Sequence, residues 1–287
     1  MKRILLCTDG SPFAQSSYPY AAWFAQGMGA SVDVLYVTDS RGQATAEASN
    51  LSGSIGLGAA ESLLNKLVEV EHERAKLNHQ RAKLILADAE AAIAAHGVTT
   101  VKLIHKTGFL VDCLEDLEVD VDLIVLGKRG EAANFASGHL GANVDRIVRS
   151  THTPCLITPK TLVPLDRLLV AYDGSPTGQK LLRFLVETPH LRNLEIHLIT
   201  VASSESDTEK TQCLAEAKAM LQAAGLTPTA SLQVGEPEKA IARYIDDQSI
   251  SLLLMGAYGH RRIRHLVIGS TTVQLLRSSQ IPVLLYR

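Results

Sequence analysis

Short apolar runs alternate with longer amphipathic segments along the whole chain. In the second half the apolar runs predict strands at Arg167–Tyr172, Glu195–Val201, Thr229–Val234, Leu252–Gly256 and Val283–Tyr286. The segments between them have helical apolar spacing, over Gln179–Glu187, Glu209–Ala224, Pro237–Asp247 and Thr271–Ser279. Strands that alternate with helices are typical of βαβ units, which build a parallel sheet covered by helices.

The first half repeats this alternation but contains one much longer helical segment. Its apolar runs predict strands at Ile4–Thr8, Ser31–Val37, Thr100–His105, Leu123–Gly127 and Cys155–Thr158. After the second of these, an apolar stripe of helical period runs from about Ala59 to His96. The Gly-, Ser- and Ala-rich segment before it, Ser40–Gly58, predicts a loop.

The two halves are copies of one another. Arg3–Pro12 recurs as Arg167–Pro176, 164 positions later, and both copies end in Asp-Gly-Ser-Pro. Asp122–Gly127 matches Ser251–Gly256 at a separation of only 129, so the first copy carries about 35 additional residues, placed near 40–76. Two prolines, Pro159 and Pro164, bracket a short polar link. We therefore predict two tandem domains, 1–160 and 161–287.

Composition narrows the class of protein. Hydrophobic residues make up 46% of the chain and charged residues 20%, as in globular proteins. The net charge of −2 gives no whole-chain reason to expect a nucleic-acid or membrane partner, and no apolar run is long enough for a membrane span. The segment before Asp9 is too short for a signal peptide, and the four cysteines include no CxxC pair. We expect a soluble, cytoplasmic protein without a metal site.

Glycines and hydroxyl side chains follow two strands of the second half. Asp173–Pro176 leads from its first strand into a helix, and Gly256 and Gly259 follow its fourth. After nine more residues, which include His260, Arg261, Arg262, Arg264 and His265, the segment Gly269–Thr272 opens the last helix. Ligands of open α/β sheets bind at the carboxyl ends of strands, and a helix N-terminus offers free N–H groups to an anion. Each piece alone is more typical of a turn or a helix cap, but together they favour a phosphate-bearing ligand.

The second half resembles the universal stress protein family, and the whole chain is similar to the tandem members of that family. The resemblance rests on the Asp-Gly-Ser turn, on Met255-Gly256, on the Gly-x2-Gly-x9-Gly-Ser pattern and on the last strand after Ile281-Pro282. It implies α/β architecture in each half, a Rossmann-like or flavodoxin-like domain with five parallel strands in the order 3-2-1-4-5. It also implies that Cys155–Thr158 pairs with Val283–Tyr286, as an intrachain pseudo-dimer.

The resemblance further implies an ATP site in the second half. Its residues would be Ala171, Asp173, Val201, Met255, Gly256, Tyr258, Gly259, Gly269, Ser270, Thr271 and Thr272. The first half departs from the pattern, because ten residues separate Gly130 from Gly141 and Ala142-Asn143 replaces the hydroxyl pair. A second possible site there would comprise Asp9, Val37, Leu126, Gly127, Arg129, Gly130, Gly141, Ala142 and Asn143, with Lys128 as an additional source of positive charge. ATP in this half, another ligand or none all stay open.

Three functions remain open at this point. The leading hypothesis is a stress-response or regulatory module that binds ATP, alone or with Mg²⁺, to alter its contacts with a protein partner or its own assembly; a homodimer is one such assembly. This hypothesis assigns no catalytic residue. An alternative is a slow ATP hydrolase of the adenine-nucleotide α-hydrolase type, in which Asp173, His260 or His265 orients water. A third is an architectural protein whose long helix binds a partner.

Overall fold

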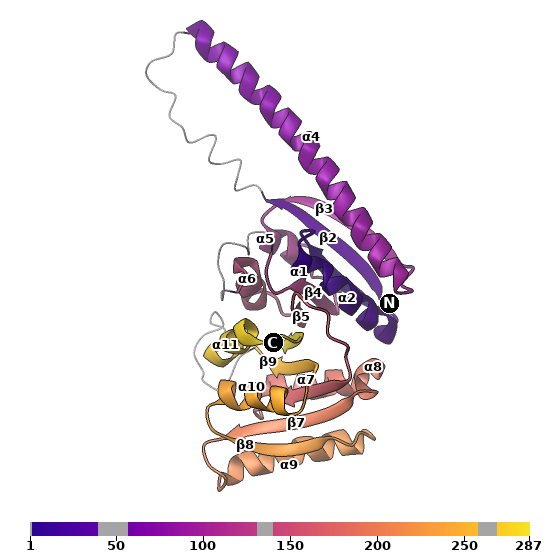
Figure 1. Cartoon of the computed structure of the whole chain (residues 1–287), viewed down its shortest axis with the longest axis vertical. Helices are drawn as coiled ribbons and strands as arrows, with labels where there is room; N and C mark the ends of the chain where they lie inside the picture. The colour runs from indigo at the N-terminus through magenta and orange to yellow at the C-terminus, as the bar shows by residue number, and fades with distance from the viewer. Residues whose placement is uncertain (1, 40–56, 131–139, 258–268) are drawn as a thin grey trace.

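The computed structural model describes residues 2–39, 57–130, 140–257 and 269–287 (Figure 1). Within these ranges ten strands form one sheet, in the order β3-β2-β1-β4-β5-β10-β9-β6-β7-β8. The first five are β1 (Arg3–Thr8), β2 (Ser31–Asp39), β3 (Val101–Gly108), β4 (Leu123–Gly127) and β5 (Cys155–Thr158). The other five are β6 (Arg167–Ala171), β7 (Glu195–Ala202), β8 (Thr229–Val234), β9 (Leu252–Gly256) and β10 (Val283–Tyr286).

Each half has the strand order 3-2-1-4-5, so the predicted fold class is confirmed. Within each half neighbouring strands pair in parallel. The halves meet where β5 and β10 pair antiparallel, with Leu156 opposite Leu284. The predicted pairing of the two last strands is therefore present, and it joins two five-stranded sheets into one.

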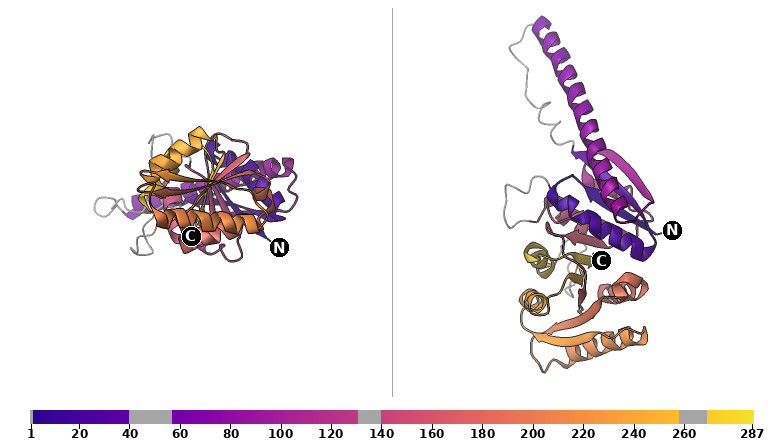
Figure 2. Two further views of the ribbon diagram at one scale, coloured as in Figure 1. Left: turned by 90° about the horizontal axis from the view of Figure 1, so that it is seen from below. Right: turned by 45° about the vertical axis from the view of Figure 1, so that its right-hand side comes forward.

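Helices cover both faces of this sheet (Figure 2). One face packs against α2 (Ser17–Met28), α4 (Leu57–Ala95), α7 (Pro176–Glu187), α8 (Pro189–Arg192) and α9 (Thr208–Ala223). The other packs against α5 (Leu110–Glu115), α6 (Ala142–Ser150), α10 (Pro237–Asp247) and α11 (Ser270–Ser278). Alternate strand residues point to opposite faces, so Ile4 and Leu6 join the first core and Leu5 and Cys7 the second.

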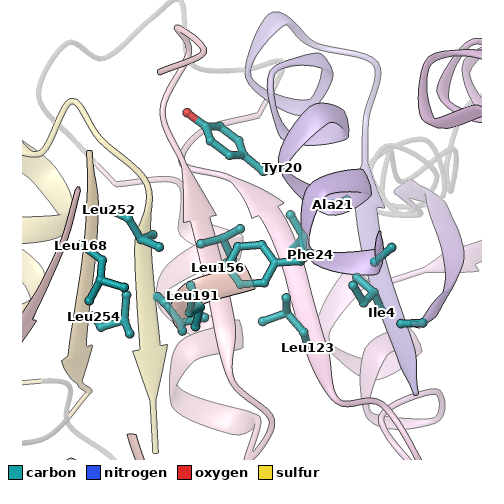
Figure 3. Packing of buried hydrophobic residues seen from close by; sticks show 14 of the residues in the cluster. Ile4, Tyr20, Ala21, Phe24, Leu123, Leu156, Leu168, Leu191, Leu252 and Leu254 are labelled. Carbon is teal, nitrogen blue, oxygen red and sulfur yellow. The ribbon is translucent and has the colours of Figure 1, made fainter. Parts of the chain in front are cut away.

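The first core runs without interruption across the junction of the halves (Figure 3). Phe24 of α2, Leu156 of β5 and Leu254 of β9 are all fully buried in it. Burial of large apolar side chains is the main favourable term in folding. The two halves therefore share the hydrophobic burial that stabilises each of them.

The long helix α4 confirms the helix predicted from Ala59 to His96, with small shifts at both ends. Its C-terminal part packs on the sheet through Ala82, Leu86, Ala89 and Ile93, which recur at intervals of four, three and four residues. Its N-terminal part projects past the sheet (Figure 1). The predicted loop at 40–58 lies outside the described residues, apart from its last two, which belong to α4.

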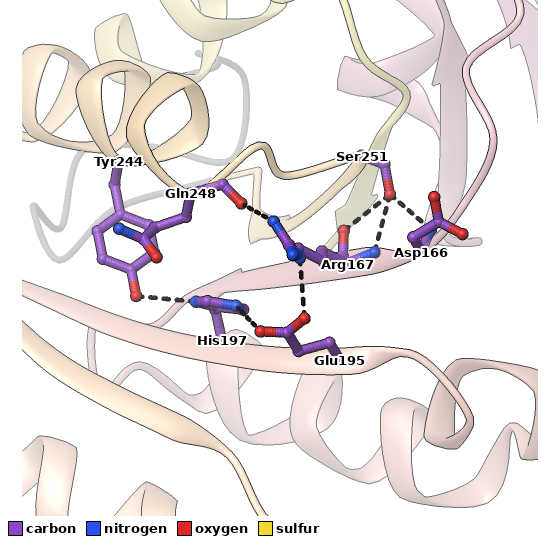
Figure 4. A network of polar contacts seen from close by, with 7 residues as sticks. All are labelled: Asp166, Arg167, Glu195, His197, Tyr244, Gln248 and Ser251. Atoms are coloured by element: carbon purple, nitrogen blue, oxygen red, sulfur yellow. Dashed lines mark hydrogen bonds and ion pairs between the residues drawn. The ribbon is translucent and has the colours of Figure 1, made fainter.

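A polar network ties the strands of the second half together at their amino ends (Figure 4). Arg167, the first residue of β6, pairs with Glu195, the first residue of β7, at 2.8 Å. The other oxygen of Glu195 is hydrogen-bonded to the buried His197, whose second ring nitrogen lies 2.9 Å from the hydroxyl of Tyr244 on α10. Arg167, and then His197, lowers the pKa of the Glu195 carboxyl. This network lies at the edge of the sheet opposite the carboxyl ends of the strands, where ligands of such folds bind.

Two cationic side chains join the halves, and each of them caps the last helix of the opposite half. Lys128, just after β4, donates from Nζ to the carbonyl oxygens of Arg277 (2.5 Å) and Ser279 (2.9 Å) at the end of α11. Arg287, just after β10, donates from Nη1 to the carbonyl oxygens of Arg149 and Thr151 at the end of α6. Cations are favourable at helix C-termini, where carbonyls lack intrahelical donors. The sequence-based role for Lys128, as positive charge for a phosphate, is therefore wrong, because its ammonium is directed across the junction to α11.

The Lys128 contact predicts a pH-dependent stability. Burial, followed by the charge of Arg129, lowers the pKa of Lys128 from 10.5 to about 8. Between these two pH values the unfolded chain binds a proton that the native protein does not, so this group makes the free energy of unfolding rise with pH. The neutral amine still has two N–H donors for the two carbonyls. Urea unfolding across this range is expected to show a steeper rise for the unchanged protein than for Lys128→Met; equal slopes would contradict the assignment.

Candidate functional site

The strand order reverses once in each half, and the candidate sites lie at those points. In the second half β6 pairs with β7 on one side and β9 on the other; in the first half β1 pairs with β2 and β4. Open α/β sheets bind their ligands at the carboxyl ends of the two central strands, where connections leave toward opposite faces. The register places Ala171 opposite Met255, so the ends of β6 and β9 bring these two predicted residues together.

The Asp-Gly-Ser-Pro segments form the same turn in both halves. Asp173 Oδ1 accepts the N–H of Ser175 at 2.9 Å, and the Ser175 hydroxyl oxygen accepts the N–H of Gly178 at the start of α7. In the first half Asp9 and Ser11 make the equivalent bonds at the start of α1 (Pro12–Gln15). The glycine between them has φ of +76° in one half and +85° in the other, a conformation that other residues adopt only with strain. Turn and cap geometry thus account for this motif without a ligand.

The N-terminus of α11 is the clearest anion-binding feature of the second half. This nine-residue helix starts after Gly269 with no side-chain cap and no acidic residue in its first turn. The backbone N–H groups of Ser270 and Thr271 have no acceptor among the residues that the structure describes. Such donors, at the positive end of the helix dipole, suit a phosphate group.

The three hydroxyl side chains of this turn have different environments. Thr272 is 3% exposed, and its hydroxyl donates to the carbonyl oxygen of Ala257 at 3.2 Å, which ties α11 to the end of β9. The Thr271 hydroxyl lies 3.5 Å from a carboxylate oxygen of Glu238 on α10. Ser270 is exposed. Phosphate binding by Thr272 stays a prediction, and the geometry favours a structural role for its hydroxyl.

The corresponding helix of the first half differs in charge. α6 also begins after a glycine, Gly141, without a side-chain cap, but Asp145 lies in its first turn and pairs with Arg149 at 2.9 Å. The carboxylate of Asp145 already interacts with the positive end of the helix dipole, so this helix start attracts a second anion less strongly. The matched position in α11 is Val273. Asp145 is absent from the set predicted from the glycine spacing, although alignment of the two copies places it opposite Val273.

Close packing explains two glycines of the second possible site. A Cβ atom on Gly127 would lie 2.6 Å from the carbonyl oxygen of Phe13, and one on Gly130 would lie 2.7 Å from Asp9 Oδ2. The Asp9 carboxylate therefore lies against the loop after β4. Arg129 is placed with its guanidinium 6.0 Å from the centre of the Phe13 ring. Residues of this predicted site are thus gathered by contacts within the protein itself.

A cavity of about 470 Å³ opens beside this turn of the first half. It is lined by Asp9, Gly10, Ser11, Pro12 and Phe13, by Arg81, Leu84, Ile85 and Asp88 of α4, and by Gly130 and Lys160. Its volume is in the range of small-molecule pockets. The cavity includes Asp9 and Gly130 from the predicted set, whereas Val37, Leu126, Gly141 and Asn143 are not part of its lining. The α4 residues could not be foreseen, since only the tertiary structure brings that helix to the turn.

Part of the predicted set lies outside the described residues, namely Tyr258, Gly259 and the cluster from His260 to His265. Of Ala142 only the backbone is described; it is the first residue of α6. Among the described residues no group of three or more His, Cys, Asp or Glu side chains is placed to hold a metal ion. In the same part of the chain, no helix combines the length and apolar character needed to cross a bilayer.

Comparison with known proteins identifies the family. The chain belongs to the universal stress protein family, whose model matches residues 1–159 and 203–287. It is 56% identical over 287 residues to Universal stress protein Slr1230 from Synechocystis sp. (strain ATCC 27184 / PCC 6803 / Kazusa), with 100% of both chains covered. The resemblance drawn from the sequence motifs is thereby confirmed.

Two solved structures share the fold over nearly the whole chain. A universal stress protein from Archaeoglobus fulgidus DSM 4304 superposes with a TM-score of 0.75 at 22% identity, covering 99% of this chain and 98% of that one. A putative universal stress protein from Pseudomonas aeruginosa UCBPP-PA14 gives 0.64 at 14% identity, covering 100% and 93%. At these sequence identities the similarity shows that the fold is shared.

Proposed function

We propose that this chain is a nucleotide-binding stress-response module, with its main ATP site at the carboxyl ends of β6 and β9. The observation that carries the proposal is the uncapped start of α11, where backbone N–H groups without an acceptor among the described residues lie beside the switch point of the sheet. Family membership and the glycine spacing that accompanies it support the same ligand.

Each part of the site has a distinct proposed role. The N–H groups of Ser270 and Thr271, with the exposed Ser270 hydroxyl, bind phosphate oxygens, and Gly269 leaves their approach free of a side chain. Asp173 serves the ribose end, Ala171 and Val201 form a partly exposed apolar surface for the base, and the backbone of Met255 lines the ribose side. Tyr258, Gly259, Gly256 and Thr272 complete the proposed set. Bound ATP would supply a charged ligand whose presence alters contacts with a protein partner or the assembly of the chain.

The first half is the weaker anion site in this proposal. Asp145 places a negative charge in the first turn of α6, and Lys128 points to α11. We therefore expect one ATP for each chain at moderate concentrations.

We retain the two tandem domains, 1–160 and 161–287, as a proposal. We also propose a cytoplasmic location, because three of the four free cysteines are buried as thiols, which suits a reducing compartment.

Calorimetry with the purified full chain tests the ATP site. We expect ATP to bind roughly tenfold or more tightly than AMP, since additional phosphates reach the start of α11. Mass spectrometry of nucleotide released from the protein as purified provides an independent reading. Absence of heat with both nucleotides, together with no released nucleotide, would overturn the proposal. Phosphate release measured in the same samples distinguishes a binding module from a slow hydrolase.

Glu238 offers a sharper test of charge near the phosphates. Its carboxylate lies 3.5 Å from the Thr271 hydroxyl and opposes an anion at the start of α11. Glu238→Gln is therefore expected to raise ATP affinity by about three- to tenfold without divalent cations. Glu236→Gln is the matched control, because Glu236 pairs with Lys239 at 2.6 Å and is expected to leave the affinity unchanged. Equal affinities of the unchanged protein and Glu238→Gln would place the phosphates elsewhere.

A further inference from the structure

The projecting part of α4 carries large apolar side chains on its surface. Between Asn65 and Arg81 nearly every residue is exposed. Val70, Leu77 and Leu84 are 61, 64 and 69% exposed, and Leu67 is 40% exposed. Long isolated helices gain most of their stability in proteins by packing an apolar face, and large exposed apolar patches mark interaction sites. The helix therefore presents a surface that suits a partner.

The spacing of these residues specifies the geometry of that surface. Val70, Leu77 and Leu84 recur at seven-residue intervals, and Leu67 lies three positions before the first of them. A seven-residue repeat with a second position offset by three is the seam of a left-handed coiled coil. On a helix with 3.6 residues per turn, Leu84 lies about 160° from Leu86, which packs on the sheet. The seam is thus a different face of α4 from the one that packs on the sheet, and at its C-terminal end Leu84 also lines the cavity beside Asp9.

Charge along the helix selects the partner and its direction. Residues 69–73 contain three glutamates and no Lys or Arg. Residues 74–83 contain Arg74, Lys76, Arg81 and Lys83 and no acidic residue. Two parallel copies of this helix would place like charges side by side along its whole length. In two antiparallel copies with an axis near residues 75–76, the glutamates at 69–73 lie opposite residues 78–82, which include Arg81, while Arg74 and Lys76 lie near the axis. The acidic block also disfavours an anionic lipid surface or nucleic acid.

We propose that α4 forms a homodimer interface in which the same helix of a second copy of this chain packs antiparallel along the seam. Leu67 then packs against the partner's Leu84, and Arg81 lies beside the partner's Glu71. A two-fold axis near residues 75–76 relates the copies, so the contact is closed and limits assembly to two chains. The seam from 67 to 84 is about 27 Å long, and it includes two arginines. Because the seam is short and contains two charged side chains, the affinity of the dimer is modest. It does not depend on nucleotide.

Sedimentation equilibrium of the full chain tests the dimer. We expect a reversible monomer–dimer equilibrium with a Kd on the order of 10 µM. Leu77→Glu is expected to weaken it by at least about 30-fold, since it places a carboxylate in the seam. Val68→Glu is the matched control: Val68 is also 64% exposed on the same helix but lies on the opposite side from Leu77. This control is expected to change the Kd by less than about threefold.

Cysteine cross-linking tests the direction of the helices. An antiparallel seam brings Val70 near the partner's Arg81, so a mixture of Val70→Cys and Arg81→Cys proteins is expected to form a mixed disulfide. Val70→Cys alone cross-links only if the helices are parallel. A chain that stays monomeric at about 100 µM, ten times the expected Kd, overturns the proposal. So does a Val68→Glu variant as disruptive as Leu77→Glu, or faster cross-linking of Val70→Cys with itself.

Discussion

Ser270→Glu is expected to lower the affinity of this chain for ATP by about 100-fold or more without lowering its thermal stability. Ser270 is the exposed first residue of α11, which has no side-chain cap and no acid in its first turn. A carboxylate at this position interacts favourably with the helix dipole, so the helix is stabilised. The same carboxylate competes for the N–H groups and repels phosphate, so binding is lost. This substitution is therefore expected to lower the ATP affinity while it stabilises the helix, so the two effects can be told apart.

Calorimetry and thermal unfolding on the same samples measure both effects. Ala142→Glu is the matched control, because Ala142 is the first residue of α6 and corresponds to Ser270 in the other copy. It is expected to leave the tight ATP site intact. Unchanged ATP affinity in Ser270→Glu would show that the start of α11 is not the phosphate site. Loss of affinity in Ala142→Glu alone would move the main site to the first half.

Gly127→Ala is expected to destabilise the protein by about 3 kcal/mol. The added Cβ would lie 2.6 Å from the carbonyl oxygen and 2.8 Å from the carbonyl carbon of Phe13, both backbone atoms of α1. Neither side can move easily, because β4 is held between β1 and β5 and α1 is fixed by the Ser11 cap. The end of β4 and the start of α1 must therefore separate.

Urea unfolding of Gly127→Ala beside Gly130→Ala tests this packing role. Among the described residues, a Cβ on Gly130 would meet the Asp9 side chain, with Oδ2 at 2.7 Å, and no backbone atom, so a smaller cost of about 1 kcal/mol is expected. If Gly127→Ala were as stable as the unchanged protein but lost a ligand of the first half, the glycine would serve that ligand instead. The comparison separates two explanations for the glycine at this position, close packing and ligand binding, which the glycine pattern alone does not distinguish.

Strand and helix positions were largely predictable, and the errors have a physical cause. The apolar runs located all ten strands of the sheet that the described residues form. The strand predicted at Ser31–Val37 extends to Asp39, because β3 continues beside it and pairs Thr38 with Thr107 and Asp39 with Gly108. A strand ends where its neighbour stops pairing, and that neighbour is about 70 residues away in the chain. Local pattern cannot contain this information.

The turns and helix starts of the candidate site were predictable in position, whereas the hydrogen-bonding state of its side chains was not. The Asp-Gly-Ser turns and the glycine before each last helix lie where the pattern placed them. The hydroxyl of Thr272 and the ammonium of Lys128 are engaged by carbonyls, which the sequence could not show. Arg81 and Asp88 of α4 line the cavity of the first half, a placement that depends on how α4 packs and that its apolar spacing does not show.

The amino-acid sequence by itself determined the duplicated α/β architecture, since the alternation of apolar runs and helical stripes depends only on neighbouring residues and is present twice. It also determined the family, which motif spacing revealed. Only the tertiary structure decided which polar groups keep free hydrogen-bonding capacity. Lys128 and the carbonyl oxygen of Arg277 are 149 positions apart, yet the β5–β10 junction brings them into contact. Because hydrogen bonds depend on distance in space, that choice is made when the two halves pack together.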